Sequence, residues 1–350
     1  MNEHEQIETL KGLARVGLKR IESPTAEDIE KHVRQACQMQ LAIGDPVASD
    51  QIIKRTRNSI EADFGVRMEL GSILKEHDHQ PWLSKNRAEI PARHYWGRYK
   101  EHLIEDKEFP PHVLTSLDRV TERILDLTAD PHSEQPFDRR GLVVGQVQSG
   151  KTANYTGLIC KAADAGYRII IVIAGIDNNL RRQTQKRIDE GFIGRNSDKG
   201  NNARRISAGV YGSSTEDIAF FTTRSSDFNT QTASNVGINL NQWAGPAVFV
   251  VKKNTSILRN LKEWLRNYTA HASGKIELPT LVIDDEADNA SINVGRNDSV
   301  SAINKQIREL LSLFNKCSYV GYTATPFANI FIEPGTKDEM LGDDLFPRSF

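Results

Sequence analysis

Five short apolar runs rich in β-branched residues lie between residues 141 and 324, and helical patterns separate them. Continuous apolar runs of this length are typical of strands that are buried on both faces. Their alternation with helices is the pattern of a parallel sheet with crossover connections. We therefore predict an α/β fold with a mostly parallel sheet and helices on both faces, its strands being GLVVG (141–145), RIIIVIAG (168–175), AVFVVK (247–252), PTLVID (279–284) and SYVGYTA (318–324).

The sequence ahead of this region has a different pattern, because its apolar residues recur at helical spacing from residue 3 to about residue 130. Thr25 and Asp28 have the spacing of a capping box, Gly44 lies where a C-terminal cap belongs, and Ser49 can cap a third helix. We predict an all-helical N-terminal domain over residues 1–135. We expect its aromatic residues to pack its core rather than stack on bases: Trp82, Tyr95, Trp96 and Tyr99.

The second domain is expected to cover residues 136–350. It contains a stretch rich in Ser, Thr, Asn and Gly at about 192–245, which is too long for a simple connection. We interpret this stretch as a polar insertion and expect part of it to be mobile.

Composition narrows the classes of function. With 38% apolar and 26% charged residues, the chain has the composition of an ordinary globular protein. A formal net charge of −1 gives no global attraction to nucleic acid, so such binding needs a local basic stripe. The three cysteines form no CxxC pair, and no signal peptide or apolar run of about 18 residues occurs. We expect a cytoplasmic protein without membrane contact.

The segment GQVQSGKTANY (145–155) follows the first predicted strand and precedes a helical pattern. In this context it predicts a phosphate-binding loop, in which backbone N–H groups and the helix N-terminus converge on phosphates. Lys151 is expected to reach the β- and γ-phosphates of ATP, and the Thr152 hydroxyl to bind Mg²⁺. The predicted nucleotide-binding residues are Gly145, Gln146, Gln148, Ser149, Gly150, Lys151, Thr152 and Ala153.

Acidic residues follow the fourth predicted strand in LVIDDEADNAS (281–291). Such a strand end suits a nucleotide hydrolase, which needs carboxylates to hold Mg²⁺ and orient water. We assign the Mg²⁺ contact to Asp285 and the polarisation of the attacking water to Glu286, and we count both with Lys151 as catalytic.

The fifth predicted strand ends in YVGYTATPFAN (319–329), which places two hydroxyl groups on a turn. They can bond an acidic neighbour and report the state of the nucleotide to a moving element. We therefore predict a coupling role for Thr323 and Thr325, together with Asp288.

The order GQVQSGKT, DDEAD, TAT resembles the first RecA-like lobe of superfamily two helicases and translocases. Within that superfamily, VVGQVQSGKTANYTGLICKAADAGYRIIIVIAGIDNNLRRQTQKRIDEGF, LVIDDEADNASIN and GYTATPFANIFI are similar to the Z-one domain family, described as bacterial endonucleases and associated with restriction-like or phage-defence loci. The resemblance covers roughly residues 90 to 350.

The resemblance implies roles for further residues. The segment AGIDNNLRRQT corresponds to one that touches the nucleic-acid backbone, which implies contacts from Asn178, Arg181, Arg182 and Gln183. Lys253, with its neighbours Lys252 and Asn254, occupies a comparable place on a later strand-to-helix turn. Arg139 and Arg140, just ahead of the phosphate loop, are placed to contact the adenine.

Two departures from the pattern are visible. Superfamily two enzymes carry an arginine finger on a second RecA-like lobe, for which this chain has no room, so we expect it to be a fragment with weak hydrolysis on its own. Outside the ATPase motifs, no cluster of carboxylates with Lys or His suits a nuclease. Any cleavage would come from further sequence or from a partner.

Two hypotheses follow. The first is an ATP- and Mg²⁺-dependent, helicase-like ATPase that acts on DNA in a bacterial restriction or anti-phage system, with a protein partner from the same defence locus. The alternative is an ATP-binding switch that gates a protein partner without touching nucleic acid, which the near-neutral charge favours.

Overall fold

The computed structural model describes residues 3–18, 21, 26–42, 44, 46, 48–63, 79, 81–83, 94–145, 150–200, 203–212, 218–269, 273–287 and 298–324. These residues belong to two compact units. One contains helices α1 to α3, and the other contains the sheet.

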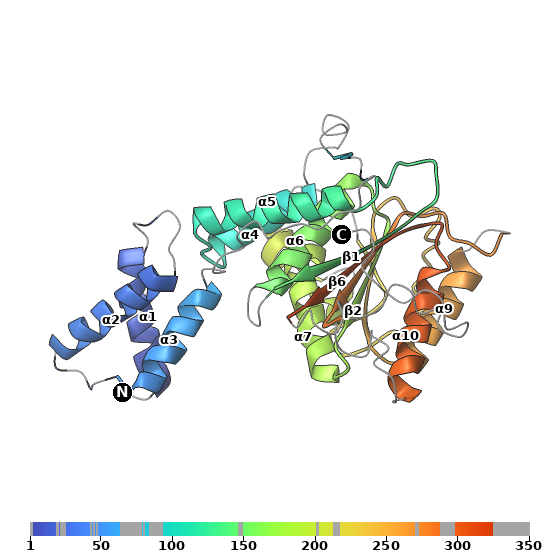
Figure 1. The fold of residues 1–350 in the computed structure, drawn as a ribbon. Coiled ribbons are helices and arrows are strands. Elements are labelled where there is room, and N and C mark those ends of the chain that lie inside the picture. The colour runs from blue at the N-terminus through green and yellow to red at the C-terminus, as the bar shows by residue number, and fades with distance from the viewer. Residues whose placement is uncertain are drawn as a thin grey trace. The chain divides into compact units, whose positions relative to one another are not determined.

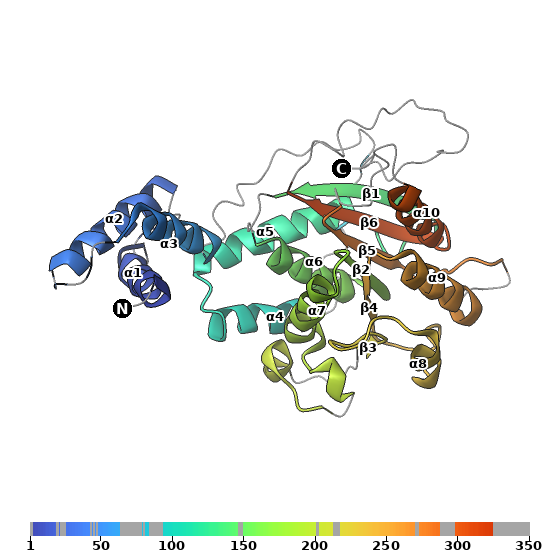
Figure 2. The ribbon, with the colours of Figure 1, turned by 90° about the horizontal axis from the view of Figure 1, so that it is seen from below.

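Six parallel strands form one sheet in the order β1-β6-β5-β2-β4-β3, which Figure 2 shows from one edge to the other. All five runs that were predicted as strands form strands, so the predicted α/β class with a parallel sheet is confirmed. The two-residue strand β3 was not predicted and lies within the polar stretch. The strand bounds are β1 Phe137–Val144, β2 Ile169–Ala174, β3 Ala219–Phe220, β4 Ala247–Lys252, β5 Thr280–Asp285 and β6 Lys316–Thr323.

Helices cover both faces of the sheet (Figure 1). One face carries α6 (Lys151–Ala165) and α7 (Asn178–Ile188), and the other carries α9 (Thr255–Thr269) and α10 (Asp298–Leu311). Every residue of β2 is buried, because the strand meets helices on both sides. Ile169, Ile171 and Ile173 alternate along β2 and join the hydrophobic core on the α9 and α10 side. The uninterrupted apolar sequence of this strand follows from that double burial.

The start of α4 (His94–Glu105) and the end of α5 (Pro111–Leu127) belong to the same unit as the sheet. The Asp164 carboxylate of α6 accepts the backbone N–H groups of Tyr95 and Trp96 at 2.8 and 2.9 Å and so caps α4. The Trp82 indole donates to the Thr128 carbonyl at 2.9 Å. All four aromatic residues expected in a core are buried: Trp82, Tyr95, Trp96 and Tyr99.

Helices α1 (Glu3–Leu18), α2 (Ala26–Ala42) and α3 (Asp50–Asp63) share a separate apolar core. Ser49 caps α3 as expected, because its hydroxyl accepts the Ile52 N–H at 3.3 Å. Gly44 follows α2 with φ +87°, a conformation that glycine adopts readily. Thr25 lies outside the described residues. The domain boundary at residue 135 stays a prediction.

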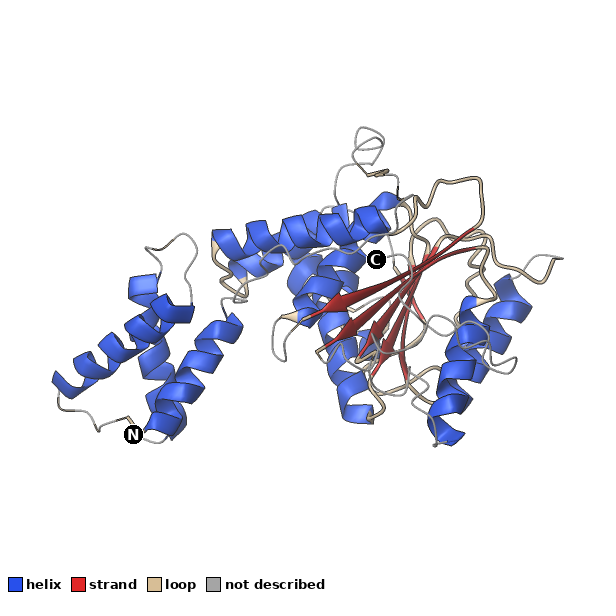
Figure 3. Ribbon diagram, in the orientation of Figure 1, coloured by secondary structure: helices blue, strands red, loops and turns tan. Residues whose placement is uncertain are grey.

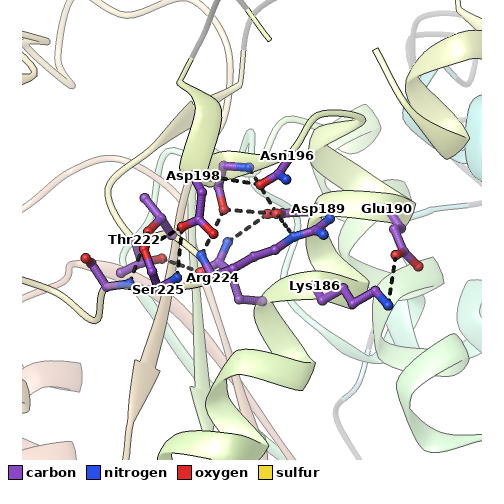
Figure 4. A network of polar contacts seen from close by, with 12 residues as sticks. Lys186, Asp189, Glu190, Asn196, Asp198, Thr222, Arg224 and Ser225 are labelled. Atoms are coloured by element: carbon purple, nitrogen blue, oxygen red, sulfur yellow. Dashed lines mark hydrogen bonds and ion pairs between the residues drawn. The ribbon is translucent and has the colours of Figure 1, made fainter. Parts of the chain in front are cut away.

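The described part of the polar stretch is built from short elements rather than one long loop. They are the π-helix η1 (Asp189–Ile193), the 3₁₀ helices η2 (Ser197–Lys199) and η3 (Ser207–Tyr211), β3, and α8 (Thr230–Asn235). A polar network around Asp189 ties this stretch to α7 (Figure 4). The Asp189 side chain is fully buried and pairs with Arg224 at 2.7 Å. Buried polar groups of this kind need such partners.

Candidate active site

The parallel strands bring their carboxyl ends to one edge of the sheet, toward which the arrowheads in Figure 3 point. Gly145 follows β1 and donates its N–H to the Thr323 carbonyl at the end of β6, at 2.9 Å. Gly150 has φ +71°, in the left-handed region, and α6 begins at the next residue. The motif therefore connects a strand to a helix N-terminus, as a phosphate loop does. Gln146, Gln148 and Ser149 lie outside the described residues.

Lys151, Thr152 and Ala153 form the first turn of α6. The Thr152 hydroxyl accepts a hydrogen bond from Nη1 of Arg187 on α7, at 2.7 Å. The Ala153 carbonyl accepts the Tyr99 hydroxyl at 3.3 Å. This turn is thus held by side chains from two other helices, and Arg187 adds a positive charge beside it.

Asp285 ends β5 at the same edge. Burial raises the pKa of its carboxyl group, while the positive charges of Lys151 and Lys253 oppose that rise. The Tyr155 hydroxyl of α6 donates to its Oδ2 at 3.3 Å. The fold therefore brings α6, which begins at Lys151, into contact with the acidic end of β5. The roles of Lys151 and Asp285 in binding a nucleotide stay predictions.

Glu286 has an unusual backbone conformation. Its φ of +55° is left-handed, which costs a non-glycine residue about 1–2 kcal/mol. Its N–H donates to Oδ1 of Asp285 at 3.1 Å. Its Oε2 lies 3.1 Å from where a Cβ on Gly175 would be, so the Glu286 side chain lies against the end of β2. Strain of this kind is typical of functional positions.

The predicted coupling residues are only partly described. Thr323 is buried at the end of β6, and β6 lies between β1 and β5 in the sheet. The backbone of Tyr322 next to it accepts the Ala287 N–H at 2.9 Å. The end of β6 therefore touches both the phosphate-loop strand and the acidic turn. Asp288 and Thr325 lie outside the described residues.

Arg181 differs from the sequence expectation. Its side chain is 2% exposed, and its guanidinium donates to the carbonyls of Thr223 and Arg224 at 2.9 and 2.7 Å. It ties α7 to the polar stretch and does not offer its charge to a nucleic-acid backbone. Asn178, Arg182 and Gln183 on the same helix are exposed, and Asn178 accepts the Lys252 ammonium at 2.8 Å.

Lys253 is also buried rather than available to nucleic acid. Its ammonium lies 2.8 Å from the Asp284 carboxylate, and neither side chain is exposed. The contact of Lys253 with a nucleic-acid backbone stays a prediction, which this structure does not favour because the Lys253 charge is already paired inside the protein.

Arg140 lies on β1 five residues before Gly145, about 16 Å along the strand from the phosphate-loop edge. Its guanidinium makes two hydrogen bonds with the Asp138 carboxylate, at 3.1 and 2.7 Å. The expected adenine contact is therefore not supported at Arg140. Arg139 donates to the Leu127 carbonyl at 3.5 Å.

The structure adds residues to the site that the sequence did not single out: Tyr155, Arg187, Asp284 and Tyr319. Tyr155, Arg187 and Asp284 contact predicted residues from α6, α7 and β5, and Tyr319 of β6 contacts Asp284. The doubled aspartate at the end of β5 was a visible signal, but the choice of partner for Asp284 needed the fold.

Among the described residues, no group of three or more His, Cys, Asp or Glu side chains gathers as a metal-ion site. Within the same residues, no helix is both long enough and apolar enough to cross a bilayer.

Comparisons with known proteins do not identify the function of this chain, which has to be inferred from the candidate site. No protein-family model matches the chain. No curated protein matches it. Among solved structures, the chain is similar to the yeast DEAD-box splicing factor Prp28, at 17% identity and a TM-score of 0.38, over 78% of this chain and 52% of that one. It is also similar to the ATP-dependent Type ISP restriction-modification enzyme LlaBIII bound to DNA, at 14% identity and a TM-score of 0.33, over 66% of this chain and 12% of that one. The chain thus spans about half of the first protein and a small part of the second.

Proposed function

We propose that this chain binds Mg-ATP and is an ATP hydrolase of the helicase-like kind. The observation that carries the proposal is that α6, which begins at Lys151 directly after a phosphate-loop motif, contacts Asp285 at the end of β5 through the Tyr155 hydroxyl, at 3.3 Å. A cationic and an anionic group at the carboxyl edge of a parallel sheet suit a nucleotide and its metal ion.

The residues present fit Mg²⁺. The Thr152 hydroxyl and the Asp285 carboxylate are oxygen donors of the type that this hard cation prefers. The metal ion, when bound, would neutralise charge on the β- and γ-phosphates. Lys151 would bind the phosphates, and Glu286 would orient water and accept its proton.

Binding is tested with Lys151→Ala. The variant is expected to lose Mg-ATP affinity by a factor of about 100, since a charged contact to phosphate is removed. The measurement is titration with a fluorescent ATP analogue in the presence of Mg²⁺. Lys305→Ala is the matched control, because Lys305 is exposed on α10, on the opposite face of the sheet. Unchanged affinity in Lys151→Ala would refute the proposal.

We further propose that the ATPase acts on DNA in a bacterial restriction or anti-phage system, with any nuclease activity supplied by further sequence or a partner. What supports this is the ordered motif set and the exposed Arg182 and Gln183 on α7, near the carboxyl edge. Membership of the Z-one domain family stays a prediction.

DNA action is tested by ATP turnover with and without single- and double-stranded DNA, with Glu286→Gln as the blank. Arg182→Glu should weaken DNA binding and lower the stimulation of turnover, whereas Arg259→Glu, exposed on α9, should not. Equal turnover with and without DNA would contradict this part of the proposal and leave ATP hydrolysis standing.

A second candidate is an ATP-binding switch that gates a protein partner. The observation that favours it is the burial of Arg181 and Lys253, which removes two of the cationic side chains expected to meet nucleic acid. If ATP binds but neither form of DNA binds the parent protein, this candidate takes precedence.

A further inference from the structure

Lys253 follows β4 and is an unusual lysine, because its side chain is entirely buried. Its charge is compensated by Asp284 of β5, whose carboxylate lies 2.8 Å away and is equally buried. The second oxygen of Asp284 accepts the Tyr319 hydroxyl at 2.6 Å. Burying such an ion pair costs several kcal/mol of desolvation, and apolar residues of similar volume often serve stability as well. Stability alone therefore does not account for this pair.

The Lys253 ammonium has a second partner, the carbonyl oxygen of Glu286. To reach it, the side chain crosses the end of β2, which separates β4 from β5 in the sheet. The residue at that crossing is Gly175, whose carbonyl accepts the Lys253 N–H at 3.4 Å. A Cβ on Gly175 would lie 2.7 Å from the Leu180 side chain and 3.1 Å from the Glu286 carboxylate, so the crossing has little room.

Glu286 is the residue whose backbone needs such support. Its left-handed φ of +55° is unfavourable for an L-residue unless the surroundings hold it. A charged donor on the Glu286 carbonyl and the Asp285 carboxylate on the Glu286 N–H hold the peptide groups on both sides of the residue. Both contacts hold the backbone from which the Glu286 side chain projects.

We propose that Lys253 is a positioning residue of the hydrolytic site, which holds Glu286 in its left-handed conformation through its carbonyl. This inference rests on the proposed function for the role of Glu286 in hydrolysis. The effect of Lys253 on the Glu286 backbone is a property of the chain alone. The rival explanation is that Lys253 only neutralises Asp284.

Two variants separate these explanations. Lys253→Met removes the donor but leaves Asp284 buried without its counter-charge, which endangers folding. The double variant Lys253→Met with Asp284→Asn removes both charges and keeps an oxygen for the Tyr319 hydroxyl. Lys262→Met is the matched control, because Lys262 of α9 is another largely buried lysine, but its carboxylate partner is Glu309 of α10.

The first measurement is amide hydrogen exchange over residues 283–287 without nucleotide, because the Glu286 and Ala287 amides are both hydrogen-bonded there. We expect exchange in the double variant to be about tenfold faster than in the parent, as for the loss of one hydrogen bond from a charged donor. Lys262→Met should exchange like the parent. Parent-like exchange in the double variant would overturn the proposal.

The second measurement is steady-state ATP turnover. The double variant should keep its affinity for ATP within about twofold and lose kcat about tenfold, since only the placement of Glu286 changes. Full turnover in the double variant would show that Lys253 merely neutralises Asp284. If the parent itself neither binds nor hydrolyses ATP, the proposed function fails, and the exchange measurement still decides whether Lys253 holds the Glu286 backbone.

Discussion

The network around Asp189 gives a sharp test of how the polar stretch is attached to the α/β unit (Figure 4). Four donors meet its carboxylate: the Gln185 amide at 3.0 Å, the Ser197 N–H at 3.0 Å, the Ser197 hydroxyl at 2.9 Å and the Arg224 Nε at 2.7 Å. Asp189→Asn keeps the shape but removes the charge, and one acceptor oxygen becomes a donor that faces other donors.

The expected loss of unfolding free energy follows from the burial of the Asp189 side chain. Breaking a buried ion pair by changing one partner costs about 3–5 kcal/mol. The Arg224 side chain is 21% exposed, so water compensates part of the loss. We therefore expect Asp189→Asn to lower the free energy of unfolding by about 3 kcal/mol, at the low end of that range.

The assay is urea unfolding followed by tryptophan fluorescence. All four tryptophans, Trp82, Trp96, Trp243 and Trp264, belong to the unit that contains the sheet, so the signal reports that unit. The matched control is Glu190→Gln, because Glu190 is the next residue and lies 3.9 Å from the exposed Lys186. Such a surface pair is worth about 0–1 kcal/mol. A loss below about 1 kcal/mol in Asp189→Asn, or equal losses in both variants, would refute the reasoning.

Three further predictions concern the site and its support. Gly175→Ala should place a methyl group against the Glu286 carboxylate. In steady-state turnover we expect kcat to fall about tenfold or more, with little change in ATP affinity. An unchanged kcat would contradict the placement of Glu286. Tyr155→Phe removes the hydroxyl that donates to Asp285. By analogy with the outer-shell partners of metal ligands, we expect the Mg²⁺ concentration needed for half-maximal turnover to rise several-fold. A Mg²⁺ titration like that of the parent would contradict a role of Tyr155 in orienting Asp285. Burial raises the pKa of Asp164 to about 6, so the folded protein holds this proton over a pH range in which the unfolded chain has released it. The stabilisation that this proton provides is complete below about pH 4 and lost as the pH rises through 6, and Asp164→Asn should flatten the dependence in urea unfolding at several pH values.

The main elements of the fold could be predicted from local patterns. RIIIVIAG reads as a strand because β2 is buried on both faces and contains no polar residue. The helices α6, α7, α9 and α10 lie between the strands, where helical patterns separate the apolar runs of the sequence. Strand β3 was not predicted, because a strand of two residues is too short to show an alternating pattern of apolar residues. The α4 segment was assigned to a helical domain because nothing in its own sequence shows that its cap, Asp164, lies on α6.

For the site, the sequence by itself determined the residue types and their order: a glycine-rich turn, Lys151 and Thr152 at a helix start, and acids at the end of a later apolar strand. These are local requirements of the proposed phosphate and metal binding, so they are visible in short motifs. The tertiary structure alone decided that β6 lies between β1 and β5 and that Arg181 is buried. It also decided that Lys253 pairs with the Asp284 carboxylate and donates to the Glu286 carbonyl. The physical reason is that a side chain's availability depends on its partners, and the carbonyls that take up the Arg181 guanidinium lie 42 and 43 positions away in the chain.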